Sequence, residues 1–142
     1  MRYDKLIRSG RAGVYAAPQL TGPLRAAALR AGLAWLDLDL AGVADRDAFL
    51  RRCAAVFSLP GYFGRNWDAL HECLLDIAGR GEPGAIVHWR RGTELARRAP
   101  EVVTTAFEVL KDVAAYWGAS RRTFLVVVDR DSARGRALRP PR

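Results

Sequence analysis

The chain has 142 residues, of which half are hydrophobic and 27% charged, and this composition is typical of one soluble globular domain. No apolar run reaches the ~20 residues of a membrane span, and no apolar segment of the kind found in secretory signals follows the N-terminus, so we expect a cytoplasmic protein without a membrane partner. The formal charge of +8 is concentrated at the two ends, because residues 33–131 carry 13 basic and 14 acidic side chains. This distribution argues against a globule that is itself a nucleic-acid binder.

Residues 1–32 form a basic N-terminal extension whose structural signals are weak. Residues 13–17 are compatible with a strand, and residues 23–30 combine Ala, Leu and Arg as a short helix could. Together they would add a βα unit in front of the core, and the sequence leaves this alternative open.

The first clear elements are a strand and a helix. Residues 36–40 alternate leucine and aspartate, which predicts a strand with one wet face. Apolar positions in residues 44–57 follow a helical spacing, with Asp45 as the expected N-cap. Both cysteines, Cys53 and Cys73, fall in helical segments, and two thiols are too few for a disulfide framework or a zinc site, so we expect free thiols.

The second half repeats the alternation of strands and helices. After a loop over 58–66 and a helix over 67–78, residues 85–89 and 123–128 have the length and apolarity of strands, and a long helix is expected from Pro100 to Trp117. Strands separated by helices imply a parallel sheet. We therefore predict an α/β fold with a small three-stranded parallel sheet flanked by helices over residues 33–131, followed by a basic disordered tail, residues 132–142.

An acidic row is the most unusual local feature. Asp68, Glu72 and Asp76 are four residues apart, so they lie along one side of the predicted helix. A solvated helix face is the simplest interpretation, but like charges at this spacing repel each other by a few tenths of a kcal/mol. A cationic partner would offset that cost.

The loop before this helix has the composition of an interface. Pro60, Gly61 and Gly64 restrict or permit unusual backbone angles, and Asn66 is a natural N-cap for the helix that starts at Trp67. Tyr62 and Phe63 place large aromatic side chains beside fixed charges, as in interface hot spots. We expect Phe63 to enter the core, which leaves Tyr62 as the candidate for contact with a partner.

The segment LPGYFGRNWDALHECL, residues 59–74, resembles the signature of the barstar family of intracellular inhibitors of bacterial ribonucleases. With the strands and helices around it, the resemblance covers residues 33–129. It implies a barstar-like α/β fold and a partner-binding surface made of this loop and helix. The positions that it assigns to inhibition are Tyr62, Gly64, Asn66, Asp68, His71, Glu72 and, on the last long helix, Asp112. The helical spacing adds Leu75 and Asp76 at the rim.

Two positions depart from the best-known member of the family, which has Trp at position 71 and Asp at position 72. Here His71 offers a smaller aromatic surface, and Glu72 keeps the charge on a longer side chain that loses more rotamer freedom on binding. These departures bear on which partner is recognised. The resemblance thus predicts an intracellular protein of the antitoxin or immunity type that binds a cognate ribonuclease or related toxin.

The residues give less support to other functions. The chain has two histidines, no nucleophile signature and no Gly-rich phosphate loop, so we expect no enzyme and no cofactor. An i,i+4 ladder on one helix offers too few converging oxygens for a metal. Two alternatives stay open, namely a nucleic-acid-binding module that uses the Arg-rich ends and a barstar-like binder of a partner other than a nuclease.

Overall fold

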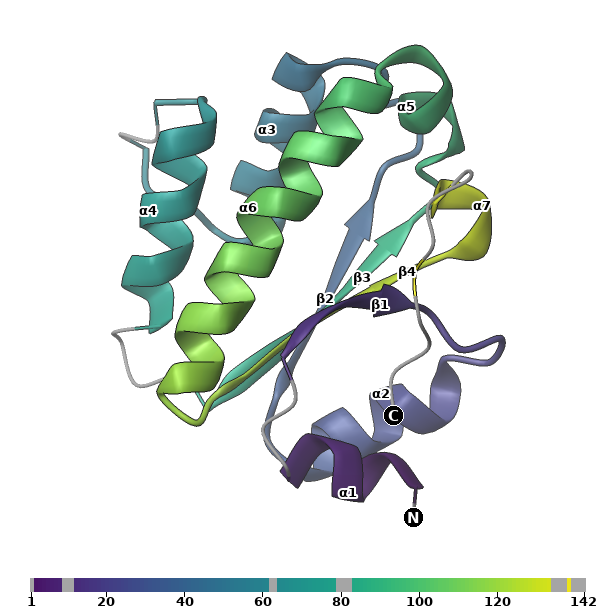
Figure 1. Ribbon diagram of the computed structural model, residues 1–142, viewed down its shortest axis with the longest axis vertical. Helices are drawn as coiled ribbons and strands as arrows, with labels where there is room; N and C mark the ends of the chain where they lie inside the picture. The colour runs from purple at the N-terminus through teal and green to yellow at the C-terminus, as the bar shows by residue number, and fades with distance from the viewer. Residues whose placement is uncertain (1, 9–11, 62–63, 79–82, 134–137, 139–142) are drawn as a thin grey trace.

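A four-stranded parallel sheet lies at the centre of the computed structural model, which describes residues 2–8, 12–61, 64–78, 83–133 and 138 (Figure 1). The strands are β1 (Gly13–Ala16), β2 (Ala34–Asp39), β3 (Gly84–Arg90) and β4 (Thr123–Val128), arranged in the order β1-β4-β3-β2. The α/β class and the parallel sheet are therefore confirmed.

The predicted count of three strands is wrong, because β1 adds a fourth at the edge beside β4. Gly13 pairs with Leu125, and the parallel register continues to Ala16 opposite Val128. A strand of four residues with two small side chains gives only a weak signal in the sequence, and its neighbour in the sheet lies more than 100 residues further along the chain. The βα unit left open for the N-terminal extension is thus present as β1 and the helix that follows it.

Helices cover both faces of the sheet, as Figure 1 shows. On one face lie α3 (Arg46–Val56), α4 (Trp67–Ala78) and α6 (Pro100–Ala119), and on the other lie α1 (Arg2–Arg8) and α2 (Gly22–Arg30). Two further short helices, α5 (Thr93–Arg98) and α7 (Arg130–Ala133), follow β3 and β4. The expected helices agree with α2, α3, α4 and α6, although α6 continues through Gly118 to Ala119. The three helices of at most seven residues were not predicted, because so short a segment shows no helical period.

Two apolar clusters form the core, one on each face of the sheet. All six residues of β4 are buried, so this strand is covered on both faces, as its almost wholly apolar sequence requires. Phe124 and Val126 belong to the cluster beneath α3, α4 and α6, whereas Leu125 and Val127 belong to the cluster with α1 and α2. Side chains alternate along a strand, so each layer of helices packs against every second residue. Residues 1–32 therefore contribute a whole layer of this fold.

Candidate functional site

The loop and α4 that carry the candidate residues are anchored at the start of the helix. Asn66 is the N-cap, and its Oδ1 accepts a hydrogen bond from the backbone N–H of Ala69 at 2.8 Å, as the sequence predicted. The ring of Trp67 packs on that of Phe49 in α3, with 5.8 Å between the ring centroids. Leu70 and Leu74 are fully buried in the core beneath the helix. These contacts fix which face of α4 meets solvent.

Asp68 and Glu72 lie one turn apart on that exposed face. Neither carboxylate forms an ion pair or a hydrogen bond with another of the described residues. Asp76 is exposed as well, but it differs from Asp68 and Glu72 because it has an interaction within the chain. Because carboxylates at i,i+4 repel each other and these two have no partner among the described residues, they are available to a partner that brings positive charge.

The loop before α4 changes direction at two residues that have left-handed backbone conformations and are not glycines. Ser58 has a φ of 52° and Arg65 a φ of 51°. Neither Gly61 nor Gly64 has a φ in the left-handed range. Gly64 serves a different purpose, because a Cβ there would lie 3.3 Å from Nδ2 of the capping Asn66.

The remaining candidates are distributed over this loop–helix unit and its neighbour. His71 and Leu75 are half-buried, and Leu75 packs against the core, so its exposed part is small. Asp112 is exposed on α6, the helix that packs beside α4. Tyr62 and Phe63 lie outside the described residues, so both assignments stay predictions.

Arg65 is a feature of this surface that the sequence interpretation missed. Its side chain is exposed between Gly64 and the N-cap, and it has no ion-pair partner within the described ranges. It brings one positive charge to a surface that otherwise displays carboxylates. An arginine rarely adopts a positive φ, so no local sequence signal indicated that this residue would form the turn into the helix.

A second polar cluster lies within the sheet, away from α4. His88 of β3 is buried, with Nε2 at 2.7 Å from Oδ1 of Asp129 and Nδ1 at 3.8 Å from Oδ1 of Asp37. Two carboxylates therefore flank the imidazole, and that of Asp129 is a hydrogen-bonding partner for this buried polar ring. Across the part of the chain that the structure describes, no group of three or more His, Cys, Asp or Glu side chains is arranged to hold a metal ion. Within that same part, every helix is too short or too polar to cross a bilayer.

The fold and this surface define a small parallel α/β domain that exposes an acidic helix face to solvent. A protein-family model described as Barstar (barnase inhibitor) matches residues 33–129, and the chain belongs to this family. The match runs from the residue before β2 to the residue after β4, and it contains the whole candidate surface. Members of the family are inhibitors that bind a ribonuclease. A comparison with curated proteins found no match.

Proposed function

We propose that this protein is an intracellular inhibitor, of the antitoxin or immunity type, that blocks the active site of a cognate bacterial ribonuclease with the loop and α4. The observation that carries the proposal is the pair of exposed carboxylates, Asp68 and Glu72, that have no partner among the described side chains. The family match supports a protein partner of this class.

The chemistry follows from what a ribonuclease cleft must bind. Such a cleft holds phosphate groups with cationic side chains, so carboxylates placed at the phosphate positions form charge-assisted hydrogen bonds with the same groups. Glu72 is the central phosphate mimic, and Asp68 lies one turn before it as the flanking group. Asn66 and Gly64 hold the loop against the helix N-terminus, which keeps both carboxylates in place before the partner arrives.

Other residues complete the contact surface in this proposal. Tyr62 packs on the catalytic histidine of the nuclease, and His71 lies beside the central carboxylate. Leu75 and Asp76 form the rim, and Asp112 on α6 adds a second acidic contact. Aromatic anchors surrounded by polar groups are typical of interfaces in which few residues dominate the binding energy.

The basic N-terminal layer does not conflict with a cationic partner, because it lies on the other side of the sheet. α1 and α2 cover the face opposite to α4 (Figure 1). There Arg30 is paired with Asp4 at 3.0 Å, and the guanidinium of Arg25 lies over the ring of Trp35, 5.9 Å from its centroid. These arginines lie across the sheet from the acidic surface, and salt screens exposed charges. Both factors limit their repulsion of a cationic partner bound at that surface.

The decisive experiment is inhibition of RNA cleavage by a panel of small bacterial ribonucleases, barnase included, with the wild type and Glu72→Gln. Gln keeps the shape and removes the charge, so we expect the inhibition constant to rise at least about a hundredfold, as when one member of a close interfacial charge pair is lost. The matched control is Glu101→Gln, which removes the same charge from an exposed position on α6. It should inhibit as the wild type does.

An equal inhibition constant for the wild type and Glu72→Gln would contradict the proposal. Failure to fold is not a concern, because Glu72 is repelled by Asp68 and its neutralisation should leave the free energy of unfolding unchanged or raise it by ~0.2–0.5 kcal/mol. Tight, salt-sensitive binding of RNA by the chain alone, without inhibition of any nuclease in the panel, would favour the nucleic-acid-binding alternative.

A further inference from the structure

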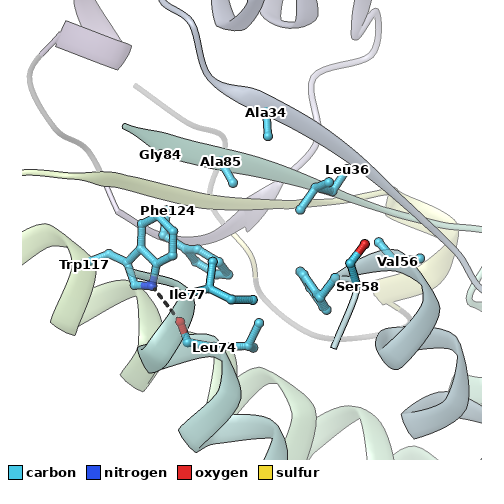
Figure 2. Close-up of a pocket in the computed structure, with 11 residues that line it drawn as sticks. Ala34, Leu36, Val56, Ser58, Leu74, Ile77, Gly84, Ala85, Trp117 and Phe124 are labelled. Atoms are coloured by element: carbon cyan, nitrogen blue, oxygen red, sulfur yellow. Dashed lines mark hydrogen bonds between the residues drawn. The ribbon is translucent and has the colours of Figure 1, made fainter. Parts of the chain in front are cut away.

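A cavity of about 170 Å³ lies beneath the C-terminal half of α4, at the amino end of the sheet (Figure 2). Residues from three helices and three strands line it, among them Leu36 of β2, Val56 of α3, Ile77 of α4 and Trp117 of α6. It opens to solvent where Ala34 and Ser58 are exposed. None of the described residues that line it carries a charge.

The position of the cavity follows from how α4 is held. Trp67 and Leu70 anchor the first half of the helix, and the indole of Trp117 reaches the carbonyl of Leu74 in the second half. The residues that begin the neighbouring strands are small, namely Ala34 in β2 and Gly84 and Ala85 in β3. They leave the space between these anchors and the start of β2 unfilled. Figure 2 shows Leu36 and Ile77 on opposite sides of the resulting space.

We propose that this cavity is a binding site for a small uncharged molecule with a single aromatic ring. A cavity of ~150 Å³ lined by Leu, Ile and Phe binds benzene or xenon, whereas drug-sized ligands need at least ~300 Å³. The hydroxyl of Ser58 at the opening can bond one polar substituent on the ring. A charged ring is disfavoured, because none of the described lining side chains could compensate for its desolvation.

The inference does not depend on the proposed function, since neither Asp68 nor Glu72 lines the cavity. The ligand would contact Leu74 and Ile77 of α4.

The test is a benzene titration of the full chain followed by methyl and indole NMR signals. We expect saturable, millimolar binding with shifts concentrated at Leu36, Val56, Ile77 and Trp117, and no saturable shifts with the charged ring N-methylpyridinium. Ala34→Leu should weaken benzene binding at least about fivefold, because the larger side chain occupies the opening. The matched control, Ala55→Leu, changes another exposed alanine, in α3, that does not line the cavity, and should bind as the wild type does.

Shifts that do not saturate or that scatter over the surface would overturn the proposal, and so would a folded Ala34→Leu that binds benzene as tightly as the wild type. Val56→Phe fills the same cavity from α3 and replaces Ala34→Leu if that variant does not fold.

Discussion

The indole N–H of Trp117 donates a hydrogen bond to the backbone carbonyl of Leu74 at 3.3 Å, and this bond joins α6 to α4 inside the core. Trp117 also packs on Phe124 of β4, with 5.3 Å between the ring centroids. One side chain thus connects the sheet, the long helix and the helix that carries the acidic row. The orientation of the candidate surface depends on this contact.

Trp117→Phe should therefore lower the free energy of unfolding. The hydrogen bond alone contributes ~0.5–1.5 kcal/mol, and the smaller ring adds a packing loss beside the cavity. Urea unfolding measures the change. Trp35→Phe is the control, because Trp35 is half-buried and its N–H lies 3.4 Å from Oδ1 of Asp37, so a smaller loss is expected. An equal decrease in the free energy of unfolding of the two variants would contradict the role of Trp117 in joining α6 to α4.

Replacement of the N-cap should affect both stability and inhibition. Asn66→Ala removes the acceptor for the backbone N–H of Ala69, which should cost ~1 kcal/mol in the free energy of unfolding and loosen the first turn that holds Asp68. Asn66→Asp keeps an acceptor and adds a charge that is favourable at a helix N-terminus, so its stability should equal or exceed that of the wild type. Chemical denaturation of both variants tests this, and a stable Asn66→Ala would show that the cap contributes nothing.

Arg65 gives a test of the sign of the partner's charge. Arg65→Ala and Arg65→Gly both remove a positive charge beside the acidic row, and either should speed association with a cationic nuclease roughly two- to fivefold at low salt. Stopped-flow kinetics at two salt concentrations measure the rate. Slower association would indicate an anionic partner instead. Arg65→Gly should also be more stable than Arg65→Ala by ~1 kcal/mol, because the backbone φ of 51° favours glycine.

The N-terminal layer should be required for stability even though it lies outside the family match. Leu24 of α2 is fully buried against Ile86 and Leu125 on the second face of the sheet. Leu24→Ala should lower the free energy of unfolding by ~2–5 kcal/mol. Leu29→Ala on the same helix removes a side chain that is 63% exposed and serves as the control. Independent unfolding of residues 1–32, with no effect of Leu24→Ala on the remainder, would contradict this prediction.

Stability should fall in acid partly through Asp39. Its carboxylate accepts a bidentate pair of hydrogen bonds from Arg91, which lowers the pKa of Asp39 from 3.8 to about 2. Since the pKa is lower in the folded protein, the stabilisation is present above pH ~4 and is lost as the pH falls towards 2. Asp39→Asn should therefore be less stable than the wild type at pH 7 and approach it at pH 2. A stability difference that does not change between these two pH values, measured by urea unfolding, would contradict this origin. Both side chains are partly exposed, so the effect is modest.

The sequence by itself determined the class of fold, the helix with its N-cap and the acidic row, because each of these depends on residues that are close together in the chain. Three local patterns predict their elements without knowledge of the tertiary structure. They are the alternation in residues 36–40, the apolar run of β4 and the Asn66 cap. The motif in residues 59–74 was enough to indicate the family.

Only the tertiary structure decided the fourth strand, the second layer of helices, the turn at Arg65 and the cavity under α4. Each of these results from contacts between distant segments, such as β1 with β4 and Trp117 with Leu74. Local sequence favours a short edge strand only weakly, and it disfavours a positive φ at an arginine. Both features persist because packing elsewhere in the fold stabilises them. Whether a carboxylate is left unpaired also depends on which arginines the fold brings near it, and local sequence contains no information about that.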